Sequence, residues 1–395
     1  MRGRVIAIDR GDREGDRDAG RVFALVRTER VDERVVDPPA AWRVGEFVDL
    51  ASGSQLAPER VPTAPYPGPG SEVMRLSRGR LAKLHARARA LATVRRFFDE
   101  RDFLEVETPL LVPSPGLEIH LDAVEAGDGF LITSPEYSMK RLLAAGCERI
   151  YQVCKCFRAN ERGSHHASEF TMIEWYRAYS NIEAIAADTE QLVHAVCGDV
   201  ARAGDRDIDV RPPWRRIPVR AAMQAWAGVT VIGDESAEQL AREVRKAGID
   251  VADGLAWDDV FFTAFVTRVE PALAALDHAI LLEDWPAPLA ALARRKQGDP
   301  KTALRFEAYV GGVELANAFD ELTDPVEQET RFRDEQEMRR VRQRPVYPID
   351  TKLVAALTEG LPPSGGIALG FDRLVMLATG ATTIDDVQAF AEHER

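Results

Sequence analysis

Hydrophobic residues gather in two stretches near the middle of the chain, over residues 148–158 and 169–177, with a polar segment between them. Both stretches are rich in β-branched and aromatic residues, which favour strands. The polar segment, residues 160–168, contains a glycine and several charged or hydroxyl side chains, as loops do. We therefore predict a β-hairpin with a long mobile loop at its tip.

The second of these strands carries an unusual face. Because side chains alternate along a strand, Phe170, Met172, Glu174 and Tyr176 should point to the same side. A carboxylate among aromatic side chains is costly to bury unless it meets a cation. This face is therefore predicted to form the wall of a pocket.

A second hairpin is predicted over residues 305–317, where the dipeptide 311–312 is Gly-Gly between two strand-like runs. If the residues that flank the dipeptide pair, Tyr309 faces Glu314, and Glu307 lies two residues further along the same side. Two carboxylates on one face either repel each other or share a cation, and magnesium is a good candidate because it prefers oxygen ligands. The alternative is an ordinary solvated strand face.

A third segment, residues 365–377, reads as a glycine-punctuated strand that runs into a helix. Glycines permit close approach of the backbone, and the N-terminus of a helix favours anionic groups. Arg373 in the first helical turn would suit a terminal phosphate. This junction is weak evidence alone, but the three segments in this order are far more specific.

Together, the three segments resemble the second motif, the acidic hairpin and the third motif of class II aminoacyl-tRNA synthetases of the lysyl subgroup. The first motif matches a helix-like run over residues 80–100 and the strand-like residues 103–109, and further matches lie at 133–142 and 314–322. The resemblance covers the chain from Leu76 onward. It is closer still to the elongation factor P–(R)-β-lysine ligases, which share an alanine at the position of Ala368.

The resemblance implies an α+β protein with the class II synthetase fold, an antiparallel sheet flanked by helices. It also implies a role for each matching residue. The catalytic arginines would be Arg158 and Arg373. The ATP-binding residues would be Arg158, Asn160, Glu161, His166, Phe170, Glu307, Glu314, Gly370 and Arg373. The substrate-binding residues would be Glu136, Glu174, Tyr176, Asn317, Glu321 and Ala368.

In these roles, Arg158 would bind the α-phosphate, while Phe170 and Arg373 would sandwich the adenine, Arg373 also reaching the γ-phosphate. His166 would contact the triphosphate, and Glu307 and Glu314 would hold Mg²⁺. The amino groups of a lysine-like substrate would meet Glu136, Glu174, Tyr176 and Glu321, and its carboxylate would meet Asn317. The family usually has Arg-x-Glu at the start of the loop, but here the third residue is Asn160 and the glutamate is Glu161. Either residue could make the contact on the adenine side.

The N-terminal part is predicted to be a separate small β domain. Strand-like pieces at 4–8, 21–26, 34–36 and 46–50 precede a Pro/Gly-rich linker at 62–70. Five short strands would make a reduced OB-like barrel. We therefore expect residues 1–70 to form this domain and its linker, and residues 71–395 the catalytic domain. Within the latter, residues 214–280 look like an inserted helical segment.

The composition narrows the range of functions that the protein could have. The chain has 395 residues and a net charge of −13, which argues mildly against tRNA binding because affinity for nucleic acid rests on cationic contacts. Residues 80–96 could still form a basic patch, or simply a solvated helix face. No apolar run approaches 18 residues, and the N-terminus is too charged for a signal peptide. We expect a cytoplasmic protein without membrane segments, whose four cysteines form no disulfide framework.

Three functions compete at this stage. The first is an ATP-dependent ligase that activates (R)-β-lysine, or lysine, and transfers it to elongation factor P. The second is a truncated lysyl-tRNA synthetase that acylates tRNA, and the third is a non-catalytic regulatory paralogue. The family also implies a homodimer whose two-fold interface is formed by the helix over residues 80–100 and the strand ending at Pro109. This interface would bury apolar positions such as Leu91, Val94, Phe97 and Phe98.

Overall fold

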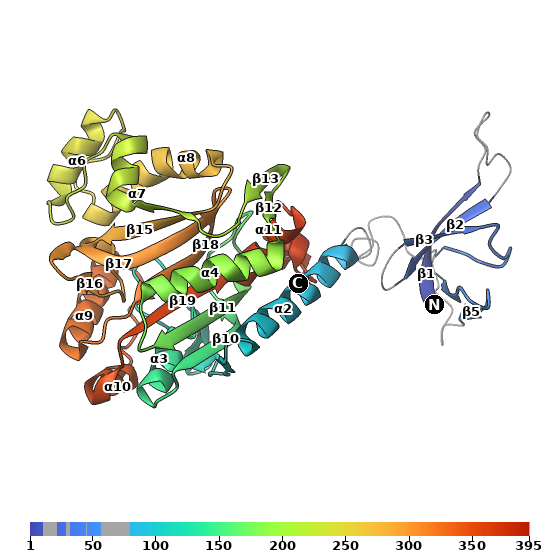
Figure 1. Cartoon of the computed structure of the whole chain (residues 1–395), viewed down its shortest axis with the longest axis horizontal. Helices are drawn as coiled ribbons and strands as arrows, with labels where there is room; N and C mark the ends of the chain where they lie inside the picture. Colours follow the sequence, from blue (N-terminus) through green and yellow to red (C-terminus); the bar gives the residue numbers. More distant parts are fainter. Residues whose placement is uncertain (11–21, 29–31, 45, 57–79, 395) are drawn as a thin grey trace. The chain divides into compact units, whose positions relative to one another are not determined.

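The structure is a computed structural model, and it describes residues 1–10, 22–28, 32–44, 46–56 and 80–394 (Figure 1). The chain divides into two compact units, one made of Met1–Arg89 with Asp386–Arg395 and the other of Ala90–Asp385. The expected domain boundary at residue 70 and the Pro/Gly linker lie outside the described residues. That boundary therefore stays a prediction.

The described part of the first unit contains five strands, paired in the order β3-β2-β1-β4-β5. Their bounds are β1 Arg2–Arg10, β2 Val22–Thr28, β3 Asp32–Val36, β4 Phe47–Asp49 and β5 Gln55–Leu56. All the pairings are antiparallel. Alternate residues of neighbouring strands, such as Val5, Ala24 and Val48, pack with Trp42 in a small core. This arrangement confirms the expected OB-like β domain.

The second unit is built on a large sheet with the strand order β14-β15-β17-β18-β19-β11-β10-β6 (Figure 1). The bounds are β6 Leu104–Glu105, β10 Arg149–Phe157, β11 Glu169–Ala178, β14 Arg215–Pro218, β15 Ile280–Pro286, β17 Asp299–Val310, β18 Val313–Asp320 and β19 Ser364–Gly370. The central pairings are antiparallel, whereas the two ends of this order, β6 with β10 and β14 with β15, pair in parallel. The expected antiparallel sheet is confirmed.

Helices cover both faces of this sheet. The helices α4 (Ile182–Cys197) and α11 (Phe371–Thr379) pack against β11, β18 and β19, and Figure 1 shows α4 running across these strands. The side chain of Asn181 caps α4 by accepting the backbone N–H groups of Glu183 and Ala184. On the other face, α3 (Glu136–Ala144), α9 (Pro325–Val341) and α10 (Thr351–Gly360) share a core with Ile150 and Tyr176.

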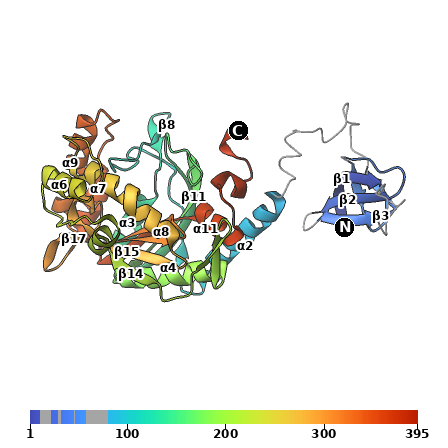
Figure 2. The ribbon, with the colours of Figure 1, turned by 90° about the horizontal axis from the view of Figure 1, so that it is seen from above.

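Residues 214–280 were predicted to be an inserted helical segment. This segment begins with the strand β14, and the part of it between β14 and β15 is helical, as predicted. Its helices are α5 (Val219–Ala222), α6 (Ala237–Lys246), α7 (Trp257–Ala264) and α8 (Glu270–Ala275). They have their own core, in which the rings of Phe261 and Phe265 stack and both lie close to Trp285 of β15. Figure 1 shows α6, α7 and α8 along one edge of this unit, and the view from above in Figure 2 again shows α6 beside α7.

The helix α2 (Arg80–Asp99) corrects one prediction. Its side chains Val94, Phe97 and Phe98 are already buried inside this chain, where the Phe98 ring stacks on Tyr151 at 4.4 Å and lies 5.3 Å from the ring of Trp175. These positions were predicted to be buried by a partner subunit, and that prediction is wrong for all three. The helical pattern marked a buried face correctly, but the sheet of the same chain covers it.

No helix within the described residues is long and apolar enough to cross a membrane. The four cysteines are free.

Candidate active site

A cavity of about 690 Å³ lies in the second unit, within the size range of small-molecule sites. Its wall contains nearly all the site residues predicted from the sequence. They are Glu136, Arg158, Glu161, His166, Phe170, Glu174, Tyr176, Glu307, Glu314, Asn317, Glu321, Ala368, Gly370 and Arg373. Among the described residues, Asn160 is the predicted site residue that does not line the cavity. Its φ angle is 64°, and the neighbouring Glu161 reaches the wall instead.

The hairpin of β10 and β11 forms as predicted, with Cys156 opposite Phe170 and Ile150 opposite Tyr176. Glu174 of β11 is 1% exposed. One of its carboxylate oxygens accepts the Ser134 hydroxyl at 2.6 Å and the other accepts the Tyr176 hydroxyl at 2.7 Å. Burial raises the pKa of Glu174 well above its usual range, and the charge of Glu136 adds to this. A cationic ligand would restore the ionised form.

Two more of the predicted carboxylates meet a cation of the chain itself. Lys140 of α3 is 2% exposed, and its Nζ lies 2.6 Å from Oε1 of Glu136 and 2.6 Å from Oε2 of Glu321. Lys140 was not predicted from the sequence. The i,i+4 spacing of Glu136 and Lys140, which makes the two residues neighbours on a helix such as α3, could have revealed the first of these ion pairs.

Glu118 and Glu335 also line the cavity and were not predicted. Burial and the charge of Glu136 raise the pKa of Glu118 to about 7, and burial and the charge of Glu118 raise that of Glu335 to about 8. Together with Glu136, Glu174 and Glu321, they make this part of the cavity strongly acidic. Such a surface fits a ligand with more than one positive charge.

The arginines of the site lie further from their nearest carboxylates, 3.7 Å for Arg158 and 3.9 Å for Arg373. Arg158 places its guanidinium 5.1 Å from the centre of the Phe170 ring, and its Nη1 lies 3.7 Å from Oε2 of Glu161. Arg373 donates from Nη1 to the Glu314 carbonyl at 2.6 Å, and its Nη2 lies 2.8 Å from Nε2 of His166. Burial and Arg373 lower the pKa of His166, so a neutral imidazole sits beside the guanidinium.

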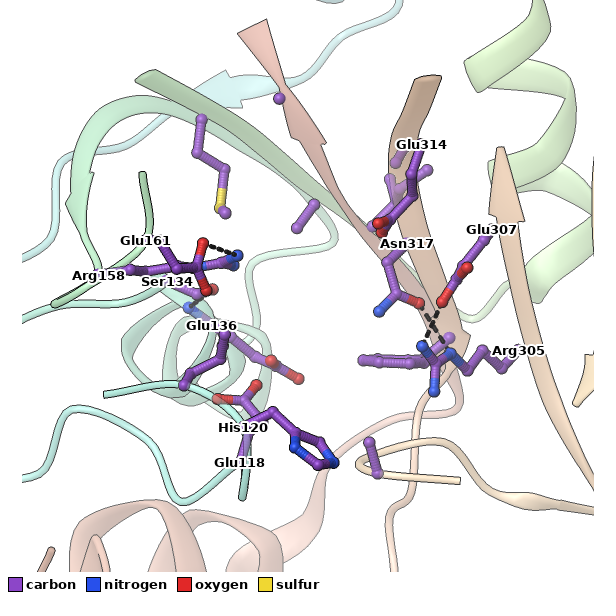
Figure 3. A pocket seen from close by; sticks show the side chains of 18 of the residues that line it. Glu118, His120, Ser134, Glu136, Arg158, Glu161, Arg305, Glu307, Glu314 and Asn317 are labelled. Atoms are coloured by element: carbon purple, nitrogen blue, oxygen red, sulfur yellow. Dashed lines mark hydrogen bonds and ion pairs between the residues drawn. The ribbon is translucent and has the colours of Figure 1, made fainter. Parts of the chain in front are cut away.

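The hairpin of β17 and β18 has the predicted register, with Val310 opposite Val313 and Tyr309 opposite Glu314. A bulge follows, so that Glu307 pairs with Asn317. Figure 3 shows Glu307, Glu314 and Asn317 grouped on one wall with Arg305.

Arg305 was not predicted from the sequence as a site residue. Its guanidinium donates to Oδ1 of Asn317 at 3.1 Å, to the Glu307 carboxylate and to the Leu289 carbonyl at 2.7 Å. The Tyr309 hydroxyl donates to Oε2 of Glu307 at 2.7 Å. Asn317 and Glu307 are therefore held in place together.

The donors Glu307 and Glu314 fit a magnesium ion that is shared with phosphates. No group of three or more His, Cys, Asp or Glu residues in the described part of the chain could hold a metal. Mg²⁺ at nucleotide sites typically takes one or two carboxylates and fills its other positions with phosphate oxygens and water. Burial raises the pKa of Glu307 to about 7; Arg305 opposes the rise and Glu314 adds to it. A nearby cation would reverse this shift.

The strand β19 closes the cavity between β11 and β18. Ala368 lies opposite Glu174 on one side and opposite Asn317 on the other. At Gly366, a Cβ atom would lie 2.2 Å from the Tyr176 ring and 2.3 Å from Oε1 of Glu321. Glycine at position 366 therefore lets the two side chains occupy this wall.

The inserted helices also reach the site, a contribution that the sequence did not disclose. Trp257, Asp258 and Phe262 of α7 line the cavity. Asp258 accepts two contacts from Arg342, at 2.7 and 2.9 Å, and lies 3.0 Å from Nε2 of His120. The insertion is thus tied to the acidic side of the cavity, where His120 lies near Glu118 (Figure 3).

Comparison with known proteins agrees with this geometry. Residues 72–394 match the family described as tRNA synthetases class II (D, K and N), and the chain belongs to this family. It is similar to the elongation factor P–(R)-β-lysine ligase of Salmonella gallinarum, 39% identical over 324 residues that cover 78% of this chain and 95% of the relative. The ligase of the same name from Histophilus somni is 37% identical over 320 residues, with the same coverage, 78% and 95%.

The chain is also similar to the lysine–tRNA ligase of Carboxydothermus hydrogenoformans, 34% identical over 315 residues. This match covers 77% of the present chain but only 64% of that relative.

Proposed function

We propose that this protein uses ATP to activate (R)-β-lysine, or lysine, as an aminoacyl-adenylate and transfers it to a lysine side chain of elongation factor P. The observation that carries the proposal is the set of buried carboxylates in a cavity that also holds Arg158 and Arg373. The acidic part suits the ammonium groups of a diamino acid, and the arginines suit phosphate. The relatives matched over 95% of their length bear the name of this ligase.

The proposed chemistry has two steps. The carboxylate of the amino acid attacks the α-phosphorus of ATP, pyrophosphate leaves, and a mixed anhydride forms. The ε-amine of the acceptor lysine then attacks the anhydride carbonyl, AMP leaves, and an amide forms. Arg158 would stabilise the charge that develops at the α-phosphate, and Arg373 that on the leaving pyrophosphate.

Two groups of residues would orient the reactants. Glu136, Glu174 and Glu321 would hold the substrate amines, and Asn317, fixed by Arg305, would hold the carboxylate. Glu307 and Glu314 would hold Mg²⁺, which supplies charge neutralisation for the phosphates when bound. Phe170 would stack on adenine with the ring face that Arg158 leaves open.

A lysine–tRNA ligase is the second candidate, because the chain also resembles those enzymes. The net charge of −13 favours a protein acceptor over RNA. A non-catalytic paralogue is the third, but Arg158, Glu307, Glu314 and Arg373 are all present and all line the cavity. We place the proposed reaction in the cytoplasm, where ATP and the translation machinery are found.

The deciding experiment is to incubate the purified protein with ATP, Mg²⁺ and labelled β-lysine, offering elongation factor P or total tRNA as the acceptor. We expect label on elongation factor P and release of AMP and pyrophosphate. Label on tRNA alone would establish the second candidate. Absence of pyrophosphate exchange with every diamino acid would overturn both.

We also propose a homodimer, whose interface uses the strand side of the predicted one and its neighbours, residues 104–111, rather than the buried face of α2. The edge strand β6 and the residues that follow it expose Leu104, Leu110 and Leu111, which are 58%, 38% and 50% exposed. An exposed apolar strand edge of this kind favours association with another chain. A second copy of the protein would bury these leucines in a two-fold interface. Sedimentation should show a dimer at micromolar concentration and a monomer for Leu104→Asp with Leu111→Asp. A wild-type monomer would refute the proposal.

A further inference from the structure

Lys140 is a buried cation directly behind the cavity wall. Its side chain does not line the cavity, whereas both of its partners, Glu136 and Glu321, do. The two ion pairs are short, 2.6 Å each. Glu136 comes from α3, and Glu321 directly follows β18, so Lys140 joins two distant parts of the wall.

The ammonium group of Lys140 is charged in this setting. Burial lowers the pKa of Lys140, but the charges of Glu136 and Glu321 outweigh burial and raise it above its usual value. Without this cation, two carboxylates would face each other inside the protein with no positive charge between them, and they would no longer be held in one arrangement.

The geometry leaves one oxygen of each carboxylate for a ligand. Lys140 engages Oε1 of Glu136 and Oε2 of Glu321. The other oxygen of Glu321, Oε1, is buried and has no hydrogen-bond partner among the described residues. Figure 3 shows the carboxylate of Glu136 directed into the cavity.

We propose that Lys140 is a positioning residue for substrate amines. It holds one oxygen of Glu136 and one of Glu321 in place and presents the remaining oxygens to the ammonium groups of a diamino acid. This inference rests on the proposed function, because it takes a diamino acid as the ligand of the cavity.

The test compares Lys140→Met, which keeps the length of the side chain and removes its charge, with Lys155→Met. Lys155 pairs with Glu169 at 3.2 Å and its side chain is 43% exposed, so it provides a matched control away from the cavity wall. In pyrophosphate exchange, Lys140→Met should raise the KM for β-lysine roughly 10- to 100-fold, the range for a hydrogen bond to a charged group. The KM for ATP and kcat should change little. An unchanged KM for β-lysine, or a loss confined to kcat, would overturn the proposal.

Chemical rescue separates positioning from packing. In Lys140→Ala, added n-butylamine should enter the vacated space and lower the KM for β-lysine toward the wild-type value, whereas n-butanol should not. Equal rescue by the alcohol would show that only volume matters and would overturn the proposal. If neither variant folds, with or without the amine, Lys140 belongs to the folding core and the proposal fails.

A separate binding measurement distinguishes failure of the Lys140 proposal from failure of the proposed function. If the wild-type protein activates no diamino acid, calorimetric titration with 1,5-diaminopentane tests the amine site without any chemistry. Binding to wild type and Lys155→Met but weakly to Lys140→Met would uphold the role of Lys140 while the proposed function fell. Equal binding to all three would overturn it.

Discussion

The site contains two sets of charges that are neutralised in different ways. In the carboxylate set, Lys140 lies 2.6 Å from both Glu136 and Glu321, and its side chain is only 3% exposed. In the arginine set, Arg158 lies 3.7 Å from Glu161 and Arg373 lies 3.9 Å from the Glu314 carboxylate. The side chains of Glu161 and Glu314 are 26% and 44% exposed.

This difference distinguishes Lys140, a permanent partner of its two carboxylates, from Glu161 and Glu314, which a ligand could replace as partners of the arginines. Buried ion pairs with short contacts are strongly coupled, because water cannot screen them. Longer and more exposed ion pairs contribute little, so Arg158 can turn to an incoming phosphate at small cost. The carboxylate set should therefore decide which amino acid binds, and the arginine set should act on the ATP that every substrate shares.

Substrate analogues should give the largest effect. Norleucine and its β-amino isomer lack the terminal amine, so a buried carboxylate would stay unpaired when they bind. Sites that pair with a polar group reject analogues without it by roughly 10⁴-fold. Pyrophosphate exchange with norleucine and with lysine, and with the two β-amino isomers, measures the ratio. Comparable use of norleucine would show that the carboxylates do not select the substrate.

The arginine set is tested by Arg158→Ala. Loss of one donor to the developing charge should lower adenylate formation by about 10²-fold or more, for β-lysine and α-lysine alike. The control is Arg211→Ala, because Arg211 pairs with Asp209 at the surface, with 63% of its side chain exposed. Near-normal pyrophosphate exchange in Arg158→Ala would remove Arg158 from the phosphate site.

Ala368 should tune the choice between isomers. Its methyl group lies on β19 between Glu174 and Asn317, where the substrate's backbone amine would pass. One methyl of misfit is worth about 1–3 kcal/mol, or roughly 10–200-fold. Ala368→Gly should therefore shift the ratio of kcat/KM values toward α-lysine. If the ratio stays the same, Ala368 is a packing residue.

The smallest effect concerns pH. The carboxyl groups of Glu118 and Glu335, with pKa values raised to about 7 and about 8, are protonated at pH 6 and ionise as the pH rises. The substrate's ε-amine, with a reference pKa near 10.4, stays charged. The KM for β-lysine should fall by up to roughly tenfold between pH 6 and 8.5, since about a tenth of a group with pKa 7 is ionised at pH 6. Glu335→Gln should flatten the upper part of the curve. A KM that rises with pH would contradict this account.

The sequence by itself determined the parts of the site that depend on local periodicity. Alternation along β11 placed Phe170, Met172, Glu174 and Tyr176 on one face, and all four line the cavity. The Gly-Gly turn fixed the register of Tyr309 with Glu314. These features follow from the two-residue repeat of a strand and from turn geometry, and neither needs information from elsewhere in the chain.

Only the tertiary structure decided which groups pair across the fold. Lys140 meets Glu321, and Arg305 meets the Leu289 carbonyl, across segments that no local pattern connects. Glu118 and Glu335 line one cavity only because separate elements fold around it. The helix α2 makes the same point, since its pattern identified Val94, Phe97 and Phe98 as buried but not the surface that covers them. A hydrophobic repeat specifies that one face of a helix is buried. Long-range packing decides which surface covers that face, because many surfaces bury an apolar side chain equally well.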